Sequence, residues 1–380
     1  MSKKLFVLAG EVSGDLHAAG VIAELLKARP DIGFFGIGGQ KLRELGGELL
    51  YDTAQMSIMG FVDVLKHSFF LRRVFRDLKE SVRREKPQAA FLIDYPGMNL
   101  VMARFFHELN IPVIYYVSPQ VWAWKEGRVK AIRRYIDRLL VIFDFEVDFF
   151  RSHGINAEFV GHPVVEELAE ILLPSKVQFL NKHRIVSGTR LIGILPGSRH
   201  QEIFHILPEM LKAARLLSRK YQAVFLLGHA PHLDAGVYRI LSEYNDLTIV
   251  HCLAYEVMQY SDLALVTSGT ATLESLCFGL PMVVVYKTGR LNYLIGRWLI
   301  KLNNISLANI VTKGLRSSER VVPELIQHDA TGHEICRQAG IILDDSGREA
   351  AIRSELLAAR KRLACSSPSH KIAGILQEYL

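Results

Sequence analysis

The stretch Thr267-Ser268-Gly269-Thr270-Ala271-Thr272-Leu273-Glu274 follows a short apolar run at 262–266 and precedes residues that keep helical spacing until Gly279. This order predicts a buried strand, a tight Ser-Gly-Thr turn and a helix. The turn leaves backbone N–H groups at a helix N-terminus, which is a favourable place for an anion. Glu274 lies about one turn into the helix, where its carboxylate can cap the helix or accept hydrogen bonds from a ribose diol. The stretch therefore indicates either a nucleotide site or only a well-capped joint between strand and helix.

A second glycine turn, Pro196-Gly197-Ser198-Arg199, follows a strand predicted at 191–195. Glycine allows backbone N–H groups to approach a phosphate, and arginine adds a bidentate donor. We expect the two turns to be the anion sites of one sheet, and we expect the amide of Asn309, in the loop 306–310, to contact the same ligand. The residues predicted to bind this nucleotide ligand are Gly197, Ser198, Arg199, Ser268, Gly269, Thr270, Glu274 and Asn309.

Acidic residues follow two strands predicted in the first half of the chain. The strand at 5–9 leads into Gly10-Glu11-Val12-Ser13-Gly14-Asp15, which lacks the GxGxxG pattern of dinucleotide sites. Glu11 and Asp15 suit sugar hydroxyls better than phosphate, unless the turn is only capped by Ser or Asp. Asp94 follows the strand at 89–93, where α/β sheets bind ligands. It is a candidate general base, or it organises the turn before the next helix.

Two further segments have more than one interpretation. Basic and apolar residues alternate irregularly over 58–75, which indicates a membrane-interface segment or a solvated helix over a core stripe. Two tryptophans follow the strand predicted at 113–117, and they line a ligand groove or pack in the core. The candidates for an acceptor or membrane face are Met59, Phe61, Phe69, Phe70, Leu71, Arg72, Arg73, Trp122 and Trp124.

The composition bounds the class of protein. The 380 residues are sufficient for two domains, and the net charge of +7 fits anionic substrates, an anionic membrane surface or nucleic acid. The four cysteines have no CxxC spacing, which argues against a disulfide framework or a zinc site. The apolar runs are too short for a transmembrane helix. No Asp-x-Asp motif accompanies the diphosphate turns, so we expect neither a metal nor another cofactor.

The alternation of strands and helices predicts an α/β protein of the GT-B type, with two doubly wound Rossmann-like domains that face each other across a cleft. We expect an acceptor-side domain at 1–165 and a UDP-sugar-binding domain at 166–345. The helices at 346–380 are expected to pack back on the N-terminal domain.

Together, the motifs resemble those of the lipid-A-disaccharide synthases, in order and over nearly the whole chain. The Ser-Pro-Gln-Val-Trp-Ala-Trp stretch is the most specific, whereas the Ser-Gly-Thr turn is shared with other GT-B enzymes. The motifs that carry the resemblance are 10–15, Asp94-Tyr95-Pro96 with Asn99, 116–124, Gly161-His162-Pro163, 195–199 and 268–274.

The resemblance implies an inverting, metal-independent transfer. A 2,3-diacylglucosamine moves from UDP to the 6-hydroxyl of 2,3-diacylglucosamine 1-phosphate (lipid X), giving a β-1,6 disaccharide 1-phosphate and UDP. It also implies a cytoplasmic enzyme, peripheral on the anionic inner membrane of a Gram-negative bacterium, without a nucleic-acid partner; a homodimer is compatible with it.

By motif position, Asp94 resembles the family's essential carboxylate and Arg199 its essential arginine. Asn309 falls in Ser-Leu-Ala-Asn where the family has Ser-Leu-Pro-Asn, and Gly97-Met98 replace an Asp-Phe pair. Asp94, Glu11 and Asp15 all remain candidates for the general base. Two other classes compete with this interpretation: another UDP-sugar enzyme of the GT-B type, such as an epimerase or a peptidoglycan transferase, and a non-catalytic binder of membranes or nucleic acid.

Overall fold

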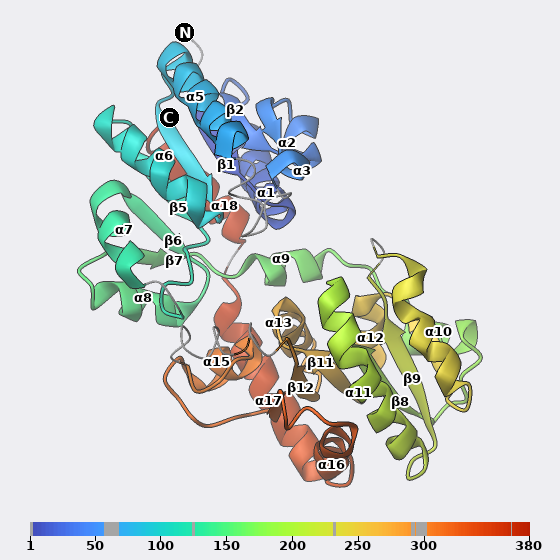
Figure 1. Ribbon diagram of the computed structural model, residues 1–380. Helices are drawn as coiled ribbons and strands as arrows, with labels where there is room; N and C mark the ends of the chain where they lie inside the picture. Colours follow the sequence, from blue (N-terminus) through green and yellow to red (C-terminus); the bar gives the residue numbers. More distant parts are fainter. Residues whose placement is uncertain are drawn as a thin grey trace. The chain divides into compact units, whose positions relative to one another are not determined.

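A computed structural model describes residues 3–56, 68–123, 126–230, 233–289, 293, 302–365 and 367–380. The chain divides into two compact units (Figure 1). Unit 1 contains Met1–Glu167 and Leu363–Leu380, and unit 2 contains Leu168–Arg362. Each unit has one parallel β-sheet flanked by helices, so the predicted architecture of two doubly wound α/β domains is confirmed.

Unit 1 has a seven-stranded sheet of order β3-β2-β1-β4-β5-β6-β7, in which every pair is parallel. The strand order reverses between β1 and β4, which are neighbours with Leu8 opposite Leu92. Ligands of open α/β sheets bind beyond the carboxyl ends of the strands at such a reversal. The strands are β1 (Lys4–Ala9), β2 (Gly33–Gly38), β3 (Glu48–Asp52), β4 (Ala89–Ile93), β5 (Val113–Tyr116), β6 (Arg138–Val141) and β7 (Ala157–Phe159).

The helices of unit 1 cover a sheet whose strands are apolar on both faces, as expected for parallel strands. Phe6 and Leu8 pack into a core with residues of α5 and α6, while α1 and α18 pack against each other. The helices are α1 (Val12–Ala28), α2 (Gln40–Glu44), α3 (Thr53–Met56), α5 (Ser68–Glu85), α6 (Pro96–Glu108), η1 (Glu126–Arg128), α7 (Val129–Tyr135), α8 (Asp144–Arg151), α9 (Pro163–Ala169) and α18 (Pro368–Gln377).

Unit 2 has a six-stranded parallel sheet of order β10-β9-β8-β11-β12-β13, which reverses between β8 and β11. Its strands are β8 (Arg190–Leu195), β9 (Ala223–Gly228), β10 (Ile249–Cys252), β11 (Leu263–Thr267), β12 (Met282–Tyr286) and β13 (Glu324–Ile326). Its helices are α10 (Lys176–Lys182), α11 (His200–Ser218), η2 (Ala235–Tyr244), α12 (Ala254–Tyr260), α13 (Thr270–Cys277), α15 (Leu307–Lys313), α16 (Gly332–Leu343) and α17 (Ser346–Leu363).

The C-terminal helices divide between the units. Helix α17 lies almost wholly in unit 2, and only α18 belongs to unit 1. Helix α17 is held in unit 2 because its Arg353 and Arg360 donate to the carbonyl oxygens of Gly279 and Cys277 at the end of α13. The expectation that all of 346–380 packs on the N-terminal domain is therefore corrected to α18.

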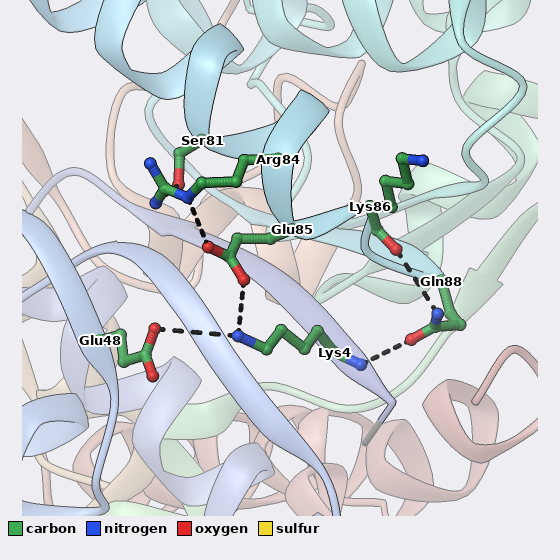
Figure 2. A network of polar contacts seen from close by, with 7 residues as sticks. All are labelled: Lys4, Glu48, Ser81, Arg84, Glu85, Lys86 and Gln88. Atoms are coloured by element: carbon green, nitrogen blue, oxygen red, sulfur yellow. Dashed lines mark hydrogen bonds and ion pairs between the residues drawn. The ribbon is translucent and has the colours of Figure 1, made fainter. Parts of the chain in front are cut away.

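Figure 2 shows how Lys4, at the amino end of β1, joins the last turn of α5 to the amino end of β3 and to Gln88, which directly precedes β4. The Nζ atom of Lys4 lies 2.6 Å from Oε2 of Glu85 and 4.0 Å from Oε2 of Glu48. The backbone N–H of Lys4 donates to Oε1 of Gln88, and Arg84 donates to the second oxygen of Glu85. This end of α5 is thus fixed at the edge of the sheet opposite to the carboxyl ends of the strands.

Candidate functional site

The sheet of unit 2 brings the two predicted anion turns together. Strands β8 and β11 are adjacent, with Leu195 opposite Val266, and each leads directly into its glycine turn. Both turns therefore lie at the carboxyl edge where the strand order reverses. This is the position at which doubly wound sheets bind nucleotides.

In the first turn, Gly197 has φ +113°, a conformation that side-chain-bearing residues rarely adopt. The backbone N–H groups of Ser198 and Arg199 then point to one place, where both donate to Oε2 of Glu202 at 3.1 and 3.3 Å. The guanidinium of Arg199 donates to the other oxygen of Glu202 at 2.8 Å. The turn has the donor geometry of an anion site, and a carboxylate of the same chain occupies it.

The second turn opens α13. Gly269 has φ +151° and precedes the first helical residue, while the hydroxyl of Ser268 donates to the carbonyl oxygen of Ile305. Gly269 and Thr270 are exposed, so the N-terminus of α13 is accessible. Half-buried Glu274 accepts a hydrogen bond from the hydroxyl of Tyr255 at 3.2 Å. The turn is thus available to a diphosphate, and the carboxylate of Glu274 has a partner that orients it.

Asn309 is fully buried rather than available to a ligand. Its Nδ2 donates to the carbonyl oxygen of Val322 and to Glu324, and its Oδ1 accepts from the N–H groups of Val321 and Val322. These four hydrogen bonds satisfy the amide and join α15 to β13. This arrangement corrects the expectation that Asn309 presents its amide to the nucleotide.

In unit 1, Asp94 follows β4 in a strained conformation. Asp94 and Tyr95 have φ +46° and +48°, and Val117, just after the neighbouring β5, has φ +59°. Such conformations are costly for residues other than glycine and cluster at functional sites. Fully buried Tyr115 and Asn99 stabilise the bend by donating to the carbonyl oxygen of Asp94. The carboxylate therefore projects from a rigid turn beside the strand reversal.

The pKa of the half-buried Asp94 carboxyl is raised to about 6, chiefly by burial and further by the negative charge of Glu11. A backbone hydrogen bond at Tyr95 and the charge of His17 oppose this shift. A carboxyl with such a pKa is ionised at neutral pH and is a stronger base than an ordinary aspartate.

We therefore expect kcat/KM to fall as the pH decreases through about 6, because protonation removes the base. A Glu11→Gln variant should move this limb to lower pH, since it removes a negative charge that raises the pKa of Asp94. The measurement is a pH–rate profile of both proteins. A profile that stays flat from about pH 5 to 7 would contradict this role.

Asp15 has a different environment from the one expected. It is buried, and its carboxylate accepts from the backbone N–H groups of Gly39, Lys41 and Leu42 at 2.6, 3.0 and 3.3 Å. These groups belong to the N-terminus of α2, so Asp15 caps that helix. This corrects the expectation that Asp15 presents a free carboxylate to a sugar. Glu11, by contrast, is exposed.

Trp122 packs in unit 1, which settles its two interpretations in favour of the core. Its Nε1 donates to Oε1 of Glu146 at 3.0 Å, and its ring contacts Phe145 and Phe143 edge-on. Glu146 is fully buried and also accepts from Ser118, so it fixes the loop that follows β5. Burial raises the pKa of Glu146 to about 7, against the effect of its hydrogen bonds. Trp124 lies outside the described residues.

Only part of the predicted apolar and basic segment is described. Phe69 is 80% exposed, and Arg72 and Arg73 are exposed on the next turn of α5. Phe70 and Leu71 are half-buried against the core of unit 1, which corrects their assignment to an exposed face. Met59 and Phe61 lie outside the described residues.

Comparisons with known proteins identify the family. A family model described as lipid-A-disaccharide synthetase matches residues 5–373. A lipid-A-disaccharide synthase of Geobacter sulfurreducens is 39% identical, with 100% of this chain and 98% of the relative covered. One from Geobacter metallireducens is 37% identical at the same coverage. The chain belongs to the lipid-A-disaccharide synthase family.

Membership of the lipid-A-disaccharide synthase family confirms the resemblance drawn from the motifs and makes the chain a glycosyltransferase. Solved structures agree on the fold. The calicheamicin glycosyltransferase CalG4 matches with a TM-score of 0.61 at 13% identity, over 100% of this chain and 98% of that one. A complex of S. aureus MnaA with UDP matches with a TM-score of 0.66 at 11% identity, over 100% and 97%. These likenesses show the GT-B fold of this synthase-family chain.

Three residues that position the site or its neighbouring loops were not identified from the sequence: Glu202, Tyr115 and Glu146. Glu202 follows Arg199 by three residues, which is the spacing of a helix capping box and was an available signal. Tyr115 and Glu146 act through contacts with residues 21 and 28 positions away, respectively. No local pattern points to such contacts.

Proposed function

We propose that the chain moves 2,3-diacylglucosamine from UDP to the 6-hydroxyl of 2,3-diacylglucosamine 1-phosphate, with inversion at the anomeric carbon. The products are the β-1,6 disaccharide 1-phosphate and UDP. The observation that carries the proposal is the pair of glycine turns at adjacent strand ends in unit 2, in a chain of this family. Such a pair of anion-binding turns suits a diphosphate leaving group.

The donor is held by unit 2 in this proposal. The N–H groups of the turn at Gly197 and the N-terminus of α13 bind the diphosphate, and Arg199 neutralises charge as the bond to the sugar breaks. Preorganised donors of this kind stabilise the transition state more than the ground state. Glu274, oriented by Tyr255, accepts hydrogen bonds from the ribose diol.

Asp94 of unit 1 is the general base that takes the proton from the 6-hydroxyl. Its raised pKa, rigid turn and place beside the strand reversal support this role. Glu11 is the second candidate, because it is exposed and near enough for its charge to raise the pKa of Asp94. In either case a single carboxylate deprotonates the attacking oxygen, as an inverting transfer requires.

The proposal is tested by measuring UDP release by the purified protein in detergent. We expect release from UDP-2,3-diacylglucosamine only when 2,3-diacylglucosamine 1-phosphate is also present. UDP-N-acetylglucosamine, which lacks the two acyl chains, serves as the control donor. Equal release without the acceptor would indicate hydrolysis, and interconversion of UDP-N-acetylglucosamine with its 2-epimer would indicate an epimerase.

We also propose that the enzyme is cytoplasmic and binds the anionic surface of the inner membrane, where both lipid substrates reside. None of the helices in the described ranges combines the length and apolar content needed to cross a bilayer. Phe69 supplies an exposed aromatic ring, and Arg72 and Arg73 supply positive charge beside it. An aromatic residue flanked by basic residues is typical of interfacial helices.

A Phe69→Ser variant should bind anionic vesicles more weakly by about tenfold to a hundredfold, because burial of a phenylalanine side chain contributes about 1.5–3 kcal/mol. Binding of the wild type should also weaken in high salt, which screens the arginines. Sedimentation with vesicles measures both effects. Val186→Ser, which alters an exposed apolar residue of unit 2, is the matched control. If folded Phe69→Ser bound vesicles as well as the wild type does, the surface around Phe69 would not be the part of the protein that contacts the membrane.

A further inference from the structure

The diphosphate turn of unit 2 is occupied by Glu202. This carboxylate accepts from the N–H groups of Ser198 and Arg199 through one oxygen and from the Arg199 guanidinium through the other. It lies directly against the glycine, since a Cβ atom added to Gly197 would be 2.5 Å from Oε2. The donors proposed for the nucleotide are thus already used by the protein.

A carboxylate and a phosphate group satisfy these donors in the same way. Each offers two coplanar oxygen atoms to a guanidinium and accepts from neighbouring backbone N–H groups. Two anions cannot share the turn, because like charges a few ångströms apart repel strongly when partly shielded from water. A diphosphate that enters the turn must therefore displace Glu202.

The surroundings allow this exchange. The side chain of Arg199 is 81% exposed and free to turn with an incoming phosphate, and that of Glu202 is 23% exposed and has a path to solvent. Burial raises the pKa of the neighbouring Tyr286 phenol; the negative charge of Glu202 raises it further, and the positive charge of Arg199 opposes the shift.

We propose that Glu202 is an intramolecular substitute for the diphosphate of the donor. It fills the turn in the free enzyme, keeps Arg199 and the N–H groups oriented, leaves when the diphosphate enters, and takes the turn again as UDP departs. This inference rests on the proposed function of the turn as the diphosphate site. It assigns Glu202 as a positioning residue that sets nucleotide affinity and assists product release.

The alternative is that Glu202 is only a helix cap. A glutamate at this position of a helix commonly accepts from the N–H groups of the first turn, whether or not a ligand binds nearby. A permanent cap would contribute to folding stability and would not compete with UDP. The two roles differ in the direction of the change in UDP affinity when the charge is removed.

The test is calorimetric titration of the full chain with UDP and with uridine. Glu202→Gln keeps the shape and removes the charge, so UDP should bind about threefold to tenfold more tightly, as one charge-assisted competitor is weakened. Uridine, which has no phosphate, should bind with unchanged affinity. UDP should also become a stronger product inhibitor. Glu334→Gln, at the equivalent position of α16 in the same unit, is the matched control and should leave UDP affinity unchanged.

Unchanged or weaker UDP binding by Glu202→Gln, with a Tm like that of the control, would overturn the inference and leave Glu202 as a cap. Tighter binding of both UDP and uridine would also overturn it, since the gain would not involve the phosphates. If Glu202→Gln does not fold, the same titrations with Glu202→Ala decide by the same criteria. If the wild type itself binds no UDP, the proposed function fails first, which distinguishes the two claims.

Discussion

An Asp94→Asn variant is expected to lose about a hundredfold or more in turnover, while its affinity for UDP changes little. General-base catalysis typically contributes about this factor. Asparagine has nearly the same shape and tolerates left-handed backbone conformations, so the strained turn at φ +46° should persist. Single-turnover kinetics measure the chemical step, and calorimetry measures the binding of UDP.

The matched control is Glu11→Gln, which removes the other acidic candidate at the same end of unit 1. We expect it to retain most of its turnover at neutral pH and to shift only the acidic limb of the profile. If Asp94→Asn lost UDP affinity but kept its single-turnover rate, Asp94 would be a structural residue. Glu11 would then be the better candidate for the base.

The second large effect is expected for Arg199→Ala. Loss of the guanidinium should cost about 2–4 kcal/mol of transition-state stabilisation, by analogy with the removal of one oxyanion donor. In this variant the carboxylate of Glu202 would still compete with the diphosphate for the backbone N–H groups of the turn. Adding Glu202→Gln to Arg199→Ala should therefore recover part of kcat/KM.

Arg337→Ala, which disrupts a similar arginine–glutamate pair on α16, is the control and should leave kcat/KM near that of the wild type. Near-normal turnover of Arg199→Ala would exclude Arg199 from the leaving-group site. We also expect EDTA to leave the wild-type activity unchanged. Strong inhibition by EDTA that magnesium reverses would contradict the assignment of this electrostatic role to Arg199.

The fold was predictable because parallel strands are buried on both faces and appear as short apolar runs. The runs at 5–9, 191–195 and 262–266 became β1, β8 and β11, with small differences at their ends. The positions of the two glycine turns and of Asp94 followed, because a residue directly after such a strand must lie at the carboxyl edge of the sheet.

The partners of polar side chains were less predictable. Asp15 and Asn309 both belong to residue types that suit a ligand, yet they bind backbone groups that lie 12 to 27 positions away in the sequence. The choice between ligand and backbone is made by tertiary packing, which brings an N-terminus of α2 or the start of β13 within reach. Residue type and local spacing contain no information about such contacts.

The same physical reason explains why the sequence left two interpretations open for Trp122 and why it placed helix α17 in the wrong unit. Trp122 follows a strand in a segment that suits a groove, but buried Glu146 offers its Nε1 a partner in the core. The sequence predicts that α17 packs with α18 on the N-terminal domain, but the arginines of α17 donate to carbonyl groups at the end of α13. Buried polar groups require partners, and their positions are set by the whole unit.

The most direct measurement uses purified protein, UDP-2,3-diacylglucosamine and radiolabelled 2,3-diacylglucosamine 1-phosphate in detergent. We predict that the label moves into a β-1,6-linked disaccharide 1-phosphate, with one UDP released for each disaccharide formed. Label that stays in the monosaccharide while the wild type binds UDP and remains folded would contradict the proposed transfer.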